Sequence, residues 1–92
     1  MNFETTKIED FDISRYKPFT FDIAFNEESI KSLIIDNKLF YIFKNKFDDN
    51  YTLINFTYPS FGHCEVIVSE SMTEELLTDL IIAIWNKKTK CC

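Results

Sequence analysis

Glycine is almost missing from this chain of 92 residues, which has only Gly62. Loops that bind nucleotide phosphates need several glycines, because a backbone without Cβ atoms allows the phosphates to approach closely. The sequence also lacks paired Cys-x-x-Cys motifs and a His-Glu-x-x-His motif, which excludes the common structural and catalytic zinc sites. We therefore expect no cofactor and no metal, and name no cofactor-binding or metal-ligating residues.

Lysine and arginine are absent from the stretch between Phe47 and Asn86, although the chain has ten such residues elsewhere. The residues before it, from Met1 to Lys46, are nearly balanced in charge. The net charge of −5 therefore comes mainly from the C-terminal half. Such a distribution attracts a basic partner and disfavours direct binding of nucleic acid. The candidate partner-binding residues are the seven carboxylates of this stretch: Asp48, Asp49, Glu65, Glu70, Glu74, Glu75 and Asp79.

Long apolar runs are missing as well. The longest run in the last predicted helix, residues 80–85, is too short to span a bilayer, and the N-terminus has no basic segment followed by an apolar one. The three cysteines, Cys64, Cys91 and Cys92, are an odd number, which is typical of a reducing compartment. These features predict a soluble cytoplasmic protein, in the host cytoplasm if the chain comes from a phage.

The basic C-terminal end, from Lys87 to Cys92, allows two interpretations. A lysine-rich tail that ends in two cysteines resembles the prenylated ends of small GTPases, and palmitoylation would give a similar anchor. Nothing else in the sequence resembles a GTPase, so we favour a frayed tail over 89–92 with incidental thiols and no membrane contact.

The apolar pattern predicts one α+β domain spanning 1–92, because the chain is too short for two cores. An irregular N-terminal arm is expected over 1–17. The expected order is β-α-β-β-β-α, with a mostly antiparallel sheet of about four strands and two helices. The strands are expected over 19–25, 38–46, 51–58 and 64–69.

Two segments carry helical signals. The first extends from Asn26, a suitable N-cap, to the pair Asp36-Asn37, with apolar residues at helical spacing between them. The second begins at a capping box, in which Ser71 is the N-cap and Glu74 lies three residues later, and it extends to about Lys88. Its expected core stripe consists of Leu76, Leu77, Leu80, Ile81 and Ile84.

The polar face of the second helix is interrupted by Ile82, and Trp85 lies at its margin. A single exposed isoleucine needs no explanation, and a second apolar contact is an equally good interpretation. The simplest form of that contact is a twofold interface, so we predict a homodimer with Ile82 and Trp85 at the interface.

Catalytic residues are not evident. His63 and Cys64 are the one nucleophile-and-base pair, but adjacent strand residues point to opposite faces, which is wrong for a Cys–His couple. The three adjacent carboxylate pairs lie at predicted helix starts or in a turn, where capping and solvation account for them. We name no catalytic residue and expect a protein that is not an enzyme, with a small enzyme using His63 or Cys64 as the remote alternative.

An acidic surface without lysines fits a positively charged groove of the kind that binds DNA. Carboxylates at 70, 74 or 75, and 79 would be separated by about 6–7.5 Å along a helix, which is similar to the spacing of phosphates. A solvated helix face would look the same.

In length, acidity and composition rich in Phe, Ile, Asn and Lys, the chain resembles the small Arn-type anti-restriction proteins of T4-like phages. The resemblance covers the whole chain but includes no diagnostic motif. It implies a dimeric DNA mimic that inhibits a modified-cytosine-dependent restriction endonuclease and so evades host defence. The chain departs from a strong mimic in its mild charge and in Lys38, Lys44 and Lys46. The alternative is an immunity-type or anti-CRISPR-type inhibitor that recognises one basic protein without mimicking DNA.

Overall fold

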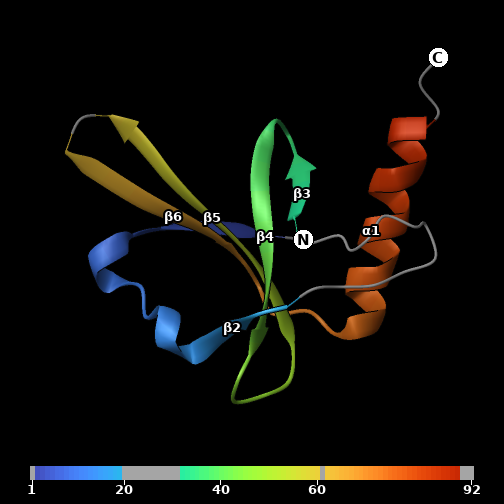
Figure 1. The fold of residues 1–92 in the computed structure, drawn as a ribbon, viewed down its shortest axis with the longest axis horizontal. Helices are drawn as coiled ribbons and strands as arrows, with labels where there is room; N and C mark the ends of the chain where they lie inside the picture. The colour runs from blue at the N-terminus through green and yellow to red at the C-terminus, as the bar shows by residue number, and fades with distance from the viewer. Residues whose placement is uncertain (1, 20–31, 61, 90–92) are drawn as a thin grey trace.

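The computed structural model describes residues 2–19, 32–60 and 62–89. They form an α+β fold in which one sheet of six strands is accompanied by the helix α1 (Glu74–Thr89) and two short 3-10 helices, η1 (Ile8–Asp10) and η2 (Ile13–Arg15) (Figure 1). The strands are β1 (Phe3–Lys7), β2 (Tyr16–Pro18), β3 (Ser32–Ile35), β4 (Lys38–Asn45), β5 (Tyr51–Ser60) and β6 (His63–Ser69).

The strands pair antiparallel in the order β1-β6-β5-β4-β2, and β3 pairs with β4 beside β2. Because β3 covers the first half of β4 and β2 the second half, both occupy the same edge of that strand. The predicted α+β class and mostly antiparallel sheet are confirmed. The predicted counts are wrong, since the described residues contain six strands and one α-helix.

The first predicted helix is contradicted over its C-terminal part. Ser32–Ile35 is a strand, and Asp36 and Asn37 have φ values of 52° and 65°, as a two-residue type I′ hairpin turn requires. Asp and Asn tolerate this left-handed conformation better than most residues do. Leu33 is 5% exposed and Ile34 57%, which is the alternation of a strand with one buried face. Most of the predicted strand over 19–25, and the helix start at Asn26, lie outside the described residues.

The N-terminal segment is not an irregular arm. All five residues of β1 pair with β6, and β2 pairs with the end of β4. Between these strands, the Asp12 side chain caps η2 by accepting a hydrogen bond from the Ser14 amide at 3.1 Å. Hydrogen bonds from Ser14 lower the pKa of this carboxyl. Of the predicted frayed tail, Thr89 ends α1 and residues 90–92 lie outside the described part.

The core lies between α1 and one face of the sheet. Leu77 and Ile81 of the helix are almost completely buried, as are Phe40, Ile42 and Leu53 of the sheet. The predicted stripe is confirmed for Leu77 and Ile81. Leu80 and Ile84 are partly buried and pack against the same cluster. Leu76 was wrongly included, since 58% of it is exposed.

Helix α1 begins later than the capping box predicts. Thr73, and not Ser71, caps it: the Thr73 hydroxyl accepts a hydrogen bond from the Leu76 amide at 3.2 Å. Ser71 cannot be the N-cap because its neighbour Met72 is held extended in a bridge with Tyr51. Glu74 and Glu75 still lie in the first turn, where carboxylates interact favourably with the helix dipole.

Candidate functional site: the acidic edge

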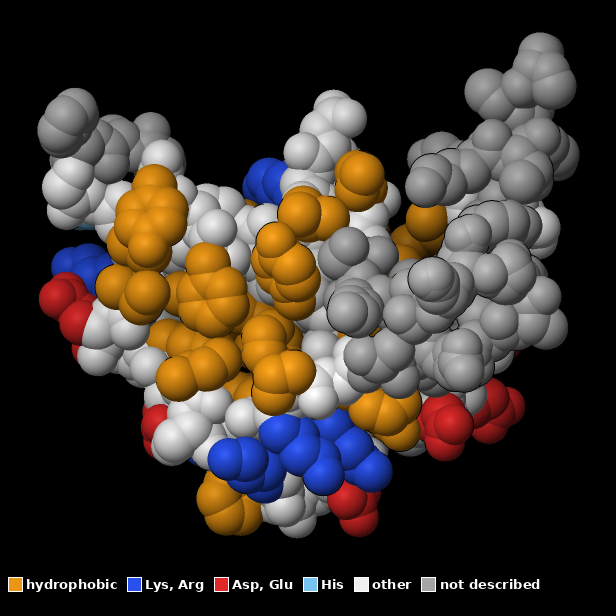
Figure 2. Space-filling model, viewed as in Figure 1, with side chains coloured by type: hydrophobic (Ala, Val, Ile, Leu, Met, Phe, Trp, Pro, Cys, Tyr) orange, Lys and Arg blue, Asp and Glu red, His pale blue; other side chains and the backbone are white. Residues whose placement is uncertain are grey.

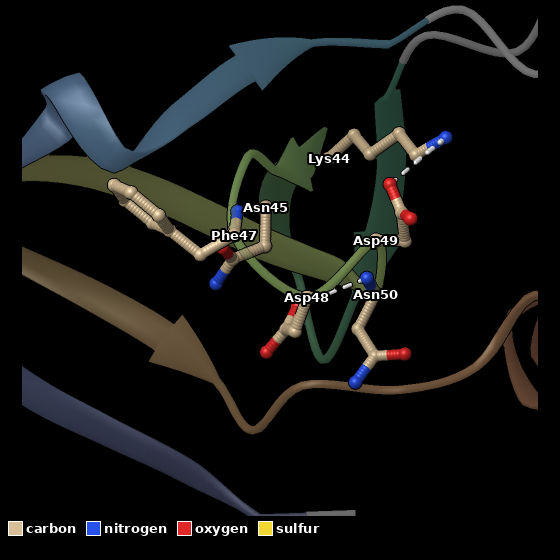
Figure 3. Close-up of polar contacts among 6 residues, drawn as sticks. All are labelled: Lys44, Asn45, Phe47, Asp48, Asp49 and Asn50. Atoms are coloured by element: carbon tan, nitrogen blue, oxygen red, sulfur yellow. Dashed lines mark hydrogen bonds and ion pairs between the residues drawn. The ribbon is translucent and has the colours of Figure 1, made fainter.

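The turn between β4 and β5 presents two of the candidate carboxylates (Figure 3). The Asn45 side chain accepts a hydrogen bond from the Phe47 amide at 2.8 Å, and the Asp48 carboxylate accepts one from the Asn50 amide at 3.0 Å. These local bonds favour a turn over continued strand. Asp49 has a φ of 61°, which turns the chain back into β5. Asp48 and Asp49 are therefore exposed at a defined turn.

A second segment joins this turn through the isolated bridge between Tyr51 and Met72. The Tyr51 amide donates to the Met72 carbonyl at 2.8 Å, and the Met72 amide donates to the Tyr51 carbonyl at 2.9 Å. Because Met72 stands just before the helix, the bridge brings the start of α1 beside the β4–β5 turn. Six of the seven predicted carboxylates lie on these two segments, all of them exposed, and we call them the acidic edge: Asp48, Asp49, Glu70, Glu74, Glu75 and Asp79.

Glu65, the seventh predicted residue, lies elsewhere. It stands in the middle of β6, opposite Lys7 of β1 in the sheet register, and is half-buried. A carboxylate beside a lysine on a neighbouring strand is a common cross-strand pair and needs no partner. The structure therefore does not join Glu65 to the acidic edge.

Basic side chains lie directly beside the acidic edge. Lys44 pairs with Asp49, with 3.8 Å between its Nζ and the carboxylate oxygen, and its Nζ also lies 5.7 Å from the centre of the Tyr51 ring. Strand β2 places Lys17 opposite Lys44, and the Arg15 carbonyl accepts a hydrogen bond from the Lys46 amide. We call Arg15, Lys17, Lys44 and Lys46 the basic border; Figure 2 shows Lys and Arg side chains gathered near β2.

The basic border could not be predicted from the sequence alone. Lys44 and Lys46 are separated in the chain from Arg15 and Lys17 by the whole segment between β2 and β4, and only the pairing of these strands unites them. The basic border lies beside the acidic edge, where Lys44 pairs with Asp49.

His63 and Cys64 are consecutive residues of β6, with His63 exposed and Cys64 half-buried. Because consecutive strand residues point to opposite faces, the side chains of His63 and Cys64 point away from each other, as we expected from the sequence. The Cys64 side chain is hydrogen-bonded to the Tyr58 phenol, which raises the pKa of Tyr58 above its usual value of 10.0. Among the described residues, no group of three His, Cys, Asp or Glu side chains is arranged to hold a metal ion.

The helix surface opposite the core bears the proposed dimer residue Ile82, of which 39% is exposed. The side chain of Trp85 lies outside the described part. Helical spacing places Glu75 and Asp79 on the same face as Ile82, so the acidic edge extends towards it. Within the described residues, no helix has the length and apolar character needed to cross a membrane.

Comparisons with models of protein families, with curated proteins and with solved structures give no match to this chain. The resemblance to phage anti-restriction proteins therefore stays a prediction.

Proposed function

We propose that this chain is a non-enzymatic acidic inhibitor that occupies a positively charged surface of a DNA-binding protein, such as a restriction endonuclease. The observation that carries the proposal is the acidic edge, in which six exposed carboxylates from the β4–β5 turn and the start of α1 are joined by the Tyr51–Met72 bridge. Among the described residues, the one ion pair of this edge joins Asp49 to Lys44, so the other five exposed carboxylates are available to a basic protein.

The geometry of α1 supports competition with DNA. Glu75 and Asp79 are four residues apart on one helix face, which separates them by about 6 Å along the axis. This is close to the spacing of phosphates along a DNA strand. Because both side chains are exposed, they can replace phosphates in contacts with lysine and arginine.

A second candidate function follows from the cations beside the acidic edge. The basic border limits the acidic edge beside β2, whereas DNA presents an uninterrupted row of phosphates. A short patch bounded by cations fits an inhibitor that recognises one particular basic protein without mimicking DNA. Both proposals predict binding to a basic surface, and they differ in whether DNA is displaced.

The experiment uses the wild-type protein as bait in a host lysate, followed by competition between the protein and labelled duplex DNA for the purified target. The test variant carries Glu74→Lys, Glu75→Lys and Asp79→Lys. The control variant carries the same charge change at exposed residues outside the acidic edge: Glu4→Lys, Glu9→Lys and Asp10→Lys.

We expect the test variant to lose at least about tenfold in affinity, since each exposed ion pair contributes roughly 0.2–1 kcal/mol and reversal adds repulsion. The control should lose much less, and wild-type binding should weaken steeply with salt. Displacement of DNA supports mimicry. Simultaneous binding of DNA and protein to the target removes the mimicry proposal, and equal losses for both variants remove the acidic edge as the binding surface.

A further inference from the structure

Strands β4 and β5 separate after only part of their length. Their register joins residues 41–44 of β4 to 51–54 of β5, and Tyr41 opposite Ile54 is the last pair. The next two pairs in this register would be Phe40 opposite Asn55 and Leu39 opposite Phe56, and neither is formed. Figure 1 shows the result, with the β3–β4 hairpin and the β5–β6 hairpin diverging. We call the space between Leu39 and Phe56 the notch.

The backbone groups at the notch point towards each other. On β4, the Leu39 carbonyl accepts a hydrogen bond from the side-chain amide of Asn55, so Leu39 directs its backbone towards β5. On β5, the Leu53 amide donates to the Ser69 hydroxyl on β6, so alternate residues, Ile54 and Phe56 among them, direct their backbones towards β4. The Leu39 amide and both backbone groups of Phe56 therefore face the notch, and no described strand pairs with them there.

Asn55 lies at the base of the notch. Asn55 is only 7% exposed. Its side-chain nitrogen donates to the Leu39 carbonyl, but its side-chain oxygen has no hydrogen-bond partner among the described residues. A buried polar atom without a partner is costly and uncommon in native proteins.

Apolar side chains line both faces of the notch. On the face towards α1, a small groove between the hairpins is lined by Phe3, Ile35, Phe40 and Ile67, with Asp36 and Lys38 at its side. On the opposite face, Leu39 and Tyr41 are 39% and 43% exposed. Figure 2 shows hydrophobic side chains gathered over the middle of the sheet. A segment placed in the notch would thus contact apolar surface on both sides.

On the sheet face opposite α1, a row of aromatic rings connects the notch to the basic border. The Phe56 ring meets Phe11 edge-on, with 6.0 Å between ring centres, and Phe11 stacks on Tyr16 at 5.6 Å. Tyr16 stands between the exposed cations Arg15 and Lys17. An extended chain of about six residues, roughly 20 Å long, would reach from the notch to these cations.

We propose that the notch binds an extended segment of another protein, apolar on both faces and acidic at the end that reaches Arg15 and Lys17. The segment adds a strand between β4 and β5, with its backbone bonded to Leu39 and Phe56. Peptide is favoured over single-stranded nucleic acid because the unpaired groups are those of a sheet edge. The net charge of −5 also disfavours nucleic acid. This binding surface is separate from the acidic edge and does not depend on the proposed function.

The test uses a fluorescent eight-residue peptide with six alternating valines and tyrosines, apolar on both faces of a strand, followed by two aspartates. A peptide of scrambled order and one ending in two lysines serve as controls, together with an oligothymidine of eight nucleotides. Binding is measured by fluorescence anisotropy on the full chain. Amide hydrogen exchange reports Leu39 and Phe56 with and without the peptide.

We expect saturable binding of the acidic peptide, weaker binding of both control peptides, and slower exchange of the Leu39 and Phe56 amides. Leu39→Pro removes the amide that faces the notch, whereas Leu39→Ala removes only the side chain. The proline variant should bind about fivefold more weakly than the alanine variant, the effect of one hydrogen bond. If Leu39→Pro does not fold, the exchange of the wild-type amides decides the question.

Three results would overturn the proposal. The first is the absence of saturation at millimolar peptide. The second is binding of oligothymidine in preference to the acidic peptide, which identifies a nucleic-acid surface. The third is protection of Leu39 and Phe56 that rises with protein concentration in the absence of peptide, which identifies a second copy of this chain as the occupant.

Discussion

Replacing Thr73 by alanine should destabilise the protein by about 1 kcal/mol. In the structure the Thr73 hydroxyl accepts a hydrogen bond from the Leu76 amide at 3.2 Å, and this amide is one of the first four of α1 that have no partner within the helix. Loss of an N-cap hydroxyl costs roughly 0.5–2 kcal/mol, and water replaces part of the bond here because the site is exposed. For a domain of this length, a change of about 1 kcal/mol lowers Tm by about 4–8 °C.

Urea unfolding followed by circular dichroism measures the effect, with two matched controls. Thr73→Ser keeps the hydroxyl and should cost less than about 0.5 kcal/mol. Ser71→Ala removes the residue that the sequence predicts as N-cap, and it should change stability by no more than about 0.5 kcal/mol, as an ordinary surface substitution does. A larger loss for Ser71→Ala than for Thr73→Ala would show that the helix begins earlier and that Glu74 and Glu75 are placed differently.

Two further predictions concern α1. Leu77→Ala should cost about 2–5 kcal/mol because Leu77 is completely buried, whereas Leu76→Ala should cost less than about 1 kcal/mol with 58% of Leu76 exposed; equal losses in urea unfolding would show that the helix is rotated. Ile82→Glu should convert a dimer to a monomer in light scattering, and added salt should strengthen the wild-type dimer because the interface brings Glu75 and Asp79 of two copies together. A wild-type monomer at micromolar concentration would contradict the dimer proposal.

The sequence predicted the elements whose signals are local. Strands β4, β5 and β6 follow alternating or continuous apolar runs bounded by turn residues, and they appear within two residues of the predicted bounds. Strand β3 was mistaken for helix because four residues, Ser32–Ile35, are too few to separate the two periodicities. Strand β1 was missed because a single apolar residue, Phe3, faces the core, and its pairing with β6 is a long-range contact that no local pattern reveals.

The same distinction applies to the candidate site. Local composition identified the carboxylates, but not which of them come together. The Tyr51–Met72 bridge joins the two segments that carry six of these carboxylates. The pairing of β1 with β6 places Glu65 opposite Lys7 instead. The basic border was also hidden, since Arg15 and Lys17 reach Lys44 only through β2. Local charge therefore predicted a kind of partner, while strand pairing determines which charged side chains share a surface.

The acidic edge and the notch lie on different parts of the sheet, which makes the two proposals independently testable. The edge uses the β4–β5 turn and the start of α1, and the notch uses the other end of β4, where the strands diverge. Charge reversal at Glu74, Glu75 and Asp79 should leave binding of the acidic peptide unchanged or strengthen it, because it removes a repulsive field. Leu39→Pro should leave binding to a basic target unchanged. If either variant abolishes both interactions, the two surfaces form one site, and the division of the molecule by charge is wrong.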